Sequence, residues 1–304
     1  MTYVRNPRFV VIGADSAIGS ALMRRLRVDA IATVGSTRRA SLGSREHFSL
    51  DLEDDLSMFE LPGCDVLVLA AAMTRLADCR ANAAAAHRIN VEAPVQIAES
   101  ALRRGGFVIF LSTNQVFDGS RAGFRSDEAV HPCSVYGKLK AEAEKRLCSL
   151  GDQVAIVRLS KTIGPHLRLF QDWQESLVAV RQIEAFTDLV MAPVSIDKVA
   201  AGIEAIGMVR AGGVWHLGGR QDISYFEVAC HLAGRLGLAQ SLVRAASAAA
   251  KGIPAEERPP HTALAPGDVD EVIGFKISDA LCELNIGLGF ETWSPPSNNI
   301  VRSA

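Results

Sequence analysis

The sequence predicts an α/β fold in which a doubly wound parallel sheet is followed by a smaller C-terminal lobe. Short apolar runs alternate with helical patterns from residue 9 to about residue 159, as a parallel sheet with helical crossovers requires. A glycine-containing turn joins the first strand to the first helix. After Leu159 the alternation loosens, which indicates a second structural part.

The elements follow one another in an order that we read from apolar periodicity. The expected strands are 9–12, 30–35, 47–52, 64–72, 106–111, 154–159 and 214–219. The expected helices are about 20–27, 82–104, 134–147, 167–183, 197–208 and 224–236. The runs 9–12 and 106–111 are apolar, which is typical of strands buried on both faces. In 134–147 apolar residues recur at four-residue spacing behind Ser134, a good N-cap.

The composition is that of an ordinary globular protein. The chain has 304 residues, is 48% hydrophobic and carries a formal charge of −2. This charge gives no electrostatic reason to expect nucleic acid or an anionic membrane as a partner. No Cys-x-x-Cys pair, leader or apolar run of about 20 residues is present, so we expect free thiols in a cytoplasmic protein. The histidines lack metal-ligand spacing, so no metal is expected, and a homodimer stays open.

The turn Gly13 to Gly19 is the first candidate binding site. A glycine turn between a strand and a helix presents backbone N–H groups to a pyrophosphate. The usual middle glycine is replaced here by Ser16. The expected contacts are Gly13, Asp15, Ser16, Ala17, Ile18 and Gly19. We therefore expect a Rossmann-type dinucleotide-binding domain over residues 1–165, completed by about 190–220, and a substrate-binding lobe over 166–189 and 221–304.

Residues that follow the next strands indicate which dinucleotide binds. NAD-binding folds usually place an acid after the second strand, whereas this chain has Arg38 and Arg39 there. Guanidinium groups suit a 2′-phosphate, so NADP(H) is favoured while NAD(H) stays open. Asp51, followed by Leu52, is placed to accept a hydrogen bond from the adenine amino group. The small residues Ala70–Ala72 allow the cofactor to lie against the end of the fourth strand.

A proton-transfer group is expected beside the strand that ends at residue 111. Ser112 and Thr113 place hydroxyls at the carboxyl end of that strand, where ligands bind in open α/β sheets. Tyr136 and Lys140 are one helical turn apart and share a face, which we expect to differ from the apolar one. A nearby ammonium lowers the pKa of a phenol, and a hydroxyl can hold the substrate oxygen beside it.

The same residues resemble a known family. Ser112 to Gly119 is similar to a Ser-Thr-Asp-Tyr-Val-Phe-Asp-Gly run, and Pro132 to Lys140 to Pro-x-x-x-Tyr-Gly-x-x-Lys. Weaker similarities are Ala71-Ala72 before a long helix with Asn90, Ala192-Pro193-Val194, and Arg258-Pro259. The chain thus resembles the extended short-chain dehydrogenase/reductases, and within them the dTDP-4-dehydrorhamnose reductase group.

The resemblance implies an NADP(H)-dependent oxidoreductase acting on a nucleotide-linked 4-keto-6-deoxy sugar. Thr113, Tyr136 and Lys140 would be catalytic, with Tyr136 donating the proton. Tyr136 and Lys140 would also contact the cofactor, Lys140 at the nicotinamide ribose. The implied substrate contacts are Ser112, Asn114, Gln115 and Arg258. Asn114 and Gln115 replace the usual Asp-Tyr, which leaves the sugar open. Two alternatives remain: an NAD-dependent epimerase or dehydratase, and a non-catalytic NADP-binding subunit like that of methionine adenosyltransferase.

Overall fold

The computed structural model describes residues 6–39 and 46–295 and confirms the expected α/β fold with a parallel central sheet. Seven strands lie in the order β11-β6-β5-β4-β1-β2-β3, and every pairing in this sheet is parallel. The strands are β1 (Phe9–Ile12), β2 (Thr33–Thr37), β3 (His47–Ser49), β4 (Val66–Leu69), β5 (Phe107–Thr113), β6 (Val154–Leu159) and β11 (Gly213–His216).

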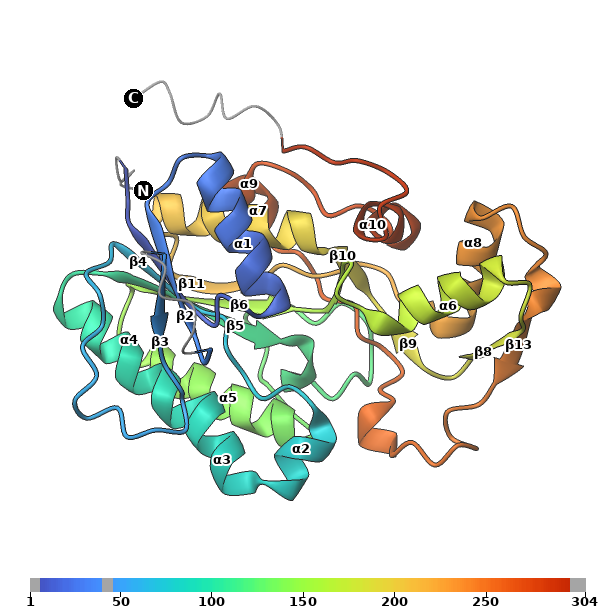
Figure 1. The fold of residues 1–304 in the computed structure, drawn as a ribbon. Coiled ribbons are helices and arrows are strands. Elements are labelled where there is room, and N and C mark those ends of the chain that lie inside the picture. The colour runs from blue at the N-terminus through green and yellow to red at the C-terminus, as the bar shows by residue number, and fades with distance from the viewer. Residues whose placement is uncertain (1–5, 40–45, 296–304) are drawn as a thin grey trace.

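Helices cover both faces of the sheet (Figure 1). The helices are α1 (Ala17–Val28), α2 (Leu76–Ala81), α3 (Ala83–His87), α4 (Ala93–Arg103), α5 (Val135–Cys148), α6 (Arg168–Val178), α7 (Ile196–Val209), α8 (Tyr225–Arg235), α9 (Val269–Ile273) and α10 (Ala280–Gly287). On one face α1 and α7 pack against the strands, and on the other face α4 and α5 do so. No helix within the described ranges is long and apolar enough to cross a bilayer.

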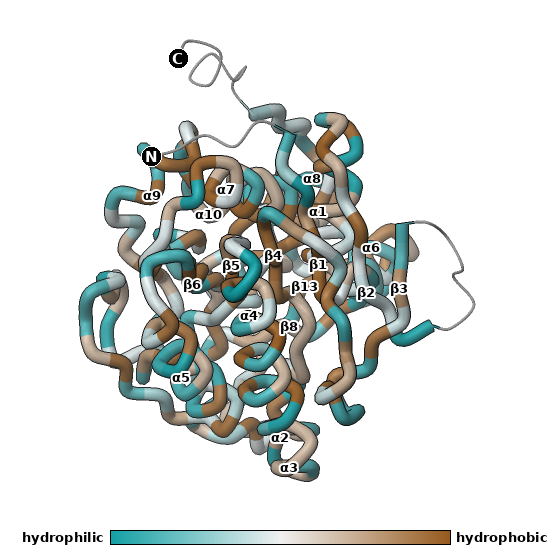
Figure 2. The backbone as a smooth tube through the Cα atoms, turned by 90° about the vertical axis from the view of Figure 1, so that its left-hand side faces the viewer, coloured by the Kyte–Doolittle hydropathy of each residue, from teal (hydrophilic) through white to brown (hydrophobic). Residues whose placement is uncertain are grey.

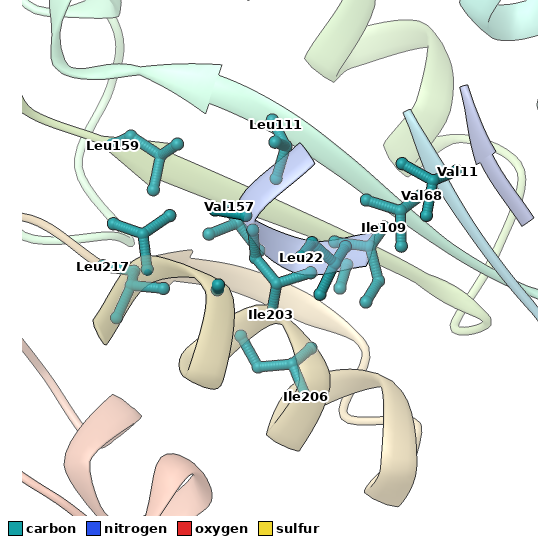
Figure 3. Packing of buried hydrophobic residues seen from close by; sticks show 14 of the residues in the cluster. Val11, Leu22, Val68, Ile109, Leu111, Val157, Leu159, Ile203, Ile206 and Leu217 are labelled. Carbon is teal, nitrogen blue, oxygen red and sulfur yellow. The ribbon is translucent and has the colours of Figure 1, made fainter. Parts of the chain in front are cut away.

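The core between the sheet and α7 consists mainly of aliphatic side chains, together with Phe9 and Phe107. Figure 3 shows Ile109 and Val157 of adjacent strands facing Ile203 and Ile206 of the helix. These side chains are fully buried, and each such burial stabilises the fold by about 1.5–3 kcal/mol. Figure 2 shows that the central strands β1 and β4 are hydrophobic, whereas polar residues recur along the outer helices. The sheet is thereby a rigid support for the loops at its edge.

A second hydrophobic cluster forms the smaller lobe at one end of the sheet (Figure 1). It contains Phe170 and Trp173 of α6 together with residues of α8. The shorter strands are β7 (Lys161–Ile163), β8 (Ile183–Phe186), β9 (Val190–Met191), β10 (Pro193–Ser195), β12 (Ile223–Ser224) and β13 (Val243–Ala246). Strands β8 and β13 pair in parallel, so residues 60 positions apart in sequence form one edge of the lobe.

Several boundaries differ from the sequence prediction. The helix expected over 167–183 ends at Val178, because Val180 takes a positive φ of 56° and β8 follows. The helix expected over 82–104 contains a π-helical segment, η1 (Arg88–Glu92), and is preceded by α2, which was not predicted. Helix α10 and the 3-10 segments η2 (Asn114–Val116), η3 (Gln240–Leu242) and η4 (Ala255–Glu257) were also not predicted.

The predicted faces of α5 were wrong. Tyr136 and Lys140 do share a face, but it is the buried face, and Ala143 and Leu147 lie on it too. Val135, expected on the apolar face, is exposed. The reason is packing, because Tyr136 clusters with Cys79 of α2 and Ala86 of α3, while the Nζ of Lys140 lies over the Phe110 ring of β5. The tyrosine therefore faces α2 and α3, and the lysine faces the sheet.

Candidate active site

The glycine turn has the geometry of a phosphate-binding loop. Gly13 has a φ of 88°, and a Cβ there would lie 2.7 Å from the Ala71 backbone nitrogen, so only glycine fits. Ser16 is the N-cap of α1, and its Oγ accepts a hydrogen bond from the Gly19 N–H at 3.0 Å. Its φ of −69° needs no glycine, which explains the departure from the three-glycine pattern. Ala17 and Ile18 present N–H groups without an acceptor among the described residues.

The end of β2 is joined to this turn by side chains. Ser36 Oγ accepts from the Gly13 N–H at 2.9 Å, and Thr37 Oγ1 donates to Asp15 Oδ2 at 3.1 Å. Arg38 and Arg39 follow as exposed residues. The structure therefore places a carboxylate at the end of β2, contributed by the glycine turn. Sequence reasoning assigned Asp15 to the turn and missed this second position, because the contact joins residues 22 apart.

The ends of β3 and β4 complete this edge of the sheet. Asp51 Oδ1 accepts from the Glu53 N–H at 3.0 Å, and Leu52 is buried. Ala70–Ala72 are half-buried just beyond β4. Asn90, in the π-helical segment, binds both backbone polar groups of Met73 at 2.9 and 3.0 Å. Asn90 therefore fixes the backbone of the segment that follows β4. Its position in the sequence did not indicate this role.

The two hydroxyls at the end of β5 have different partners. Ser112 Oγ donates to Glu144, a buried residue of α5 that also binds Arg158 through contacts of 2.7, 3.1 and 3.2 Å. Thr113 Oγ1 accepts from the Gln115 N–H at 3.2 Å and lies 3.3 Å from Asn114 Oδ1. Successive strand residues point to opposite faces. Ser112 is thus bound to the interior, while Thr113 caps η2 at the sheet edge.

Tyr136 and Lys140 lie on the buried face of α5. Tyr136 is 8% exposed and packs in a cluster with Cys79 and Ala86. Burial raises the pKa of its phenol, and the nearby Cys79 adds to this, so the phenol is protonated at neutral pH. Lys140 is 1% exposed, with its Nζ 3.7 Å from the centroid of the Phe110 ring.

Burial is also the main influence on the pKa of Lys140. It lowers the pKa of Lys140 to about 7, and the charge of Glu144 opposes this shift. We expected the ammonium to lower the pKa of the phenol, but burial is the dominant influence on both groups. The arrangement can therefore supply a proton from a neutral phenol beside a lysine that titrates near neutrality.

A cavity of about 350 Å³ opens next to the N-cap of α5, and Thr113, Tyr136 and Lys140 are not among the residues that line it. Its lining residues come from the end of β5, the start of α5 and the lobe: Asn114, Gln115, Phe117, Asp118, Cys133, Ser134, Ala255, Glu256, Pro259, Pro260 and His261. Gln115 Oε1 accepts from Ser134 Oγ at 2.9 Å, and Ser134 caps the helix that carries Tyr136. Arg258 is not in this lining, since its Nε donates to the Ile253 carbonyl at 2.9 Å.

The fold and these groups together define a class of protein. The parallel sheet and the glycine turn at the start of α1 are those of a Rossmann-like α/β protein, and a Tyr and Lys pair lies on the helix after β5. Residues 7–282 match the family described as the RmlD substrate binding domain, and the chain belongs to that family.

Two relatives illustrate the range of this family. The chain is 27% identical over 233 residues to dTDP-4-dehydrorhamnose reductase of Aggregatibacter actinomycetemcomitans, covering 73% of this chain and 76% of the relative. It is 24% identical over 256 residues to methionine adenosyltransferase 2 subunit beta of Bos taurus, covering 79% and 75%. The relatives of this chain thus include a named reductase and a named subunit of another enzyme.

Solved structures share the fold. A dTDP-4-dehydrorhamnose reductase of Bacillus anthracis, solved in complex with NADP, has a TM-score of 0.75 at 17% identity and covers 94% of this chain and 100% of its own. The protein MoeE5, solved with UDP-glucose and NAD, has a TM-score of 0.76 at 20% identity and covers 93% and 98%. These similarities establish the architecture along nearly the whole chain.

Proposed function

We propose that the protein is an NADP(H)-dependent reductase of a nucleotide-linked 4-keto-6-deoxy sugar. The observation that carries the proposal is Tyr136, a phenol kept protonated by burial, two residues beyond the cavity wall at Ser134. Family membership supports it, since a relative that matches 73% of this chain is named dTDP-4-dehydrorhamnose reductase. The six free cysteines are compatible with a cytoplasmic setting.

The residues present fit a nicotinamide dinucleotide. Gly13 lies against Ala71 without room for a Cβ, and the Ala17 and Ile18 N–H groups are available at the helix N-terminus. The residues that would hold the cofactor are those of the turn 13–19, Arg38, Asp51, Leu52, Ala70–Ala72 and Lys140. When bound, the cofactor supplies the hydride.

The protein residues supply the orientation and the proton. Thr113 would hold the sugar oxygen at the end of β5. Tyr136 would donate its phenolic proton to the carbonyl oxygen, and a positioned proton donor of this kind contributes about 10²–10⁴ to the rate. Lys140 would bind the nicotinamide ribose and stabilise the phenolate that remains after the transfer.

The lobe is proposed to bind the substrate. Residues 255–261 supply five of the residues that line the cavity, on the side facing the end of β5. Asn114 and Gln115 would contact the sugar from the sheet side. Ser112 and Arg258 are tied to Glu144 and Ile253, so we assign them the role of supporting this wall.

Turnover is the direct test. We expect NADPH absorbance to fall with at least one nucleotide-linked 4-keto-6-deoxy sugar, and Tyr136→Phe to lower kcat by at least about 10²-fold while cofactor affinity is unchanged. Tyr225→Phe, a change in the lobe, is the matched control and keeps full activity. Equal turnover in the Tyr136→Phe and Tyr225→Phe variants would show that the phenol is not the proton donor.

A non-catalytic dinucleotide-binding subunit is the second candidate. It is favoured by the tight packing of Tyr136 under Cys79 and Ala86, and by the relative named methionine adenosyltransferase 2 subunit beta. It predicts that NADP raises the melting temperature while no sugar is turned over. An NAD-dependent epimerase or dehydratase instead predicts NAD that copurifies with the protein, as MoeE5 was solved with NAD and UDP-glucose.

A further inference from the structure

His261 lies on the cavity wall with its ring held by a carboxylate. Its Nδ1 is 3.1 Å from Asp222 Oδ2, and its backbone N–H donates to the Gly119 carbonyl at 3.1 Å. The side chain is 42% exposed, whereas that of Asp222 is 15% exposed. The sequence offered no reason to join these residues, which lie 39 positions apart, and His261 was interpreted only as one of several dispersed histidines.

Asp222 is arranged to orient the ring. Its Oδ1 accepts from the Thr262 N–H and Oγ1, both at 2.8 Å, and from the Ala263 N–H at 3.0 Å. Because the carboxylate oxygens accept hydrogen bonds, Nδ1 is the donor in this pair. The other ring nitrogen, Nε2, is then left for a hydrogen bond with a ligand.

The lining of the cavity indicates which end of a nucleotide sugar it receives. Asp118 and Glu256 are acidic and disfavour a diphosphate, and His261 is the single basic side chain among the described lining residues. Carboxylates and amides suit the hydroxyl groups of a sugar, and Pro259 and Pro260 offer an apolar surface to its ring. Ser134 in this wall is the N-cap of the helix that carries Tyr136, the proposed proton donor.

We propose that His261 is a specificity-determining residue whose Nε2 hydrogen-bonds a hydroxyl of the sugar ring, and that Asp222 is the positioning residue that holds it there. The inference rests on the proposed function and adds which end of the ligand occupies the cavity. His261 belongs to the segment 255–261, so this contact would bind the sugar from the wall of the cavity that this segment forms.

Binding measurements distinguish the contribution of the sugar to the affinity from that of the nucleotide. Calorimetry with NADP present gives dissociation constants for UDP, dTDP, UDP-glucose and dTDP-glucose. The ratio of the diphosphate constant to the sugar-nucleotide constant measures what the sugar contributes. We expect His261→Phe and His261→Ala to lower this ratio about 2- to 10-fold, as the loss of one hydrogen bond predicts, with the diphosphate constants unchanged. His131→Gln alters an exposed histidine outside the lining and is the control.

Variants of Asp222 test the positioning role. Asp222→Ala frees the ring and should lower the ratio as His261→Ala does. Asp222→Asn keeps an acceptor for Thr262 and Ala263, and its amide N–H donates to Nδ1 of the other ring tautomer. The Nε2–H of that tautomer can donate to the same sugar hydroxyl, so the variant should restore most of the ratio. A purely structural role for Asp222 would instead lower the melting temperature and weaken diphosphate and sugar nucleotide alike.

Each remaining outcome overturns the inference. Equal weakening of the diphosphates by His261→Phe would place the ring at the phosphates. An unchanged ratio in both His261 variants would mean that the ring contacts no part of the ligand. If the wild-type protein binds none of the four nucleotides, the proposed function fails with the inference. Binding without an effect at residue 261 leaves the proposed function standing and rejects the inference alone.

Discussion

Removing the carboxylate of Glu144 should strongly destabilise the protein. Glu144 and Arg158 form an ion pair with side chains 6% and 5% exposed, at 2.7 Å. The pair is part of a network, because Ser112 donates to Glu144 while Arg158 contacts the Ser126 carbonyl and His216 at 3.3 Å. It therefore joins β5, α5, β6 and β11 within the interior.

The magnitude follows from burial. Glu144→Ala leaves a buried guanidinium without its carboxylate, which lowers the free energy of unfolding by about 3–5 kcal/mol. Domains are stable by about 5–15 kcal/mol in total, so the variant should be close to unfolding at ordinary temperatures. Replacing both residues, as in Glu144→Leu with Arg158→Met, should be less destabilising than the single change because no unpaired charge remains.

Urea unfolding measures these differences. Asp172→Ala is the control, since Asp172 pairs with Arg168 on the surface of α6 and such exposed pairs contribute less than about 1 kcal/mol. The reasoning is refuted if Glu144→Ala destabilises no more than Asp172→Ala, or if the double variant is the least stable of the set. Either result would mean that an unpaired charge in this network does not destabilise the fold as a buried charge should.

Three further predictions concern the site. Lys140→Met should abolish turnover yet raise stability at neutral pH. The pKa of Lys140 is lowered to about 7 in the folded protein, so burial of its ammonium costs stability in full below pH 7, and this cost disappears as the pH rises to 10.5. In urea titrations over this range, wild-type stability should therefore rise relative to that of the variant. Asp15→Asn should raise the affinity for NADPH about 2- to 5-fold relative to the affinity for NADH, because a carboxylate repels a nearby 2′-phosphate. Equal changes in the two affinities would contradict this prediction. Alkylation of Cys133, which lines the cavity, should slow when a sugar nucleotide binds, whereas Cys148 at the other end of α5 should react unchanged, as mass spectrometry of the labelled peptides would show.

The order and type of the sheet elements could be predicted from sequence because each depends on a local pattern. An apolar run such as Phe107 to Leu111 is buried on both faces wherever it is placed in a parallel sheet. The helix from Val135 was likewise marked by Ser134 as its N-cap. The prediction of which face of this helix is buried was wrong, because that depends on the elements against which the helix packs, and these lie elsewhere in the chain.

The sequence by itself determined the parallel α/β architecture, the glycine turn, and the residues of the Tyr and Lys pair, since spacing along the chain encodes all three. The tertiary structure alone decided which side chains meet: Asp15 with Thr37, Asn90 with Met73, Glu144 with Ser112, and His261 with Asp222. The physical reason is the separation along the chain of the residues that interact. Periodicity and capping act within one turn or strand, whereas these contacts depend on strand order and on how the lobe packs against the sheet edge.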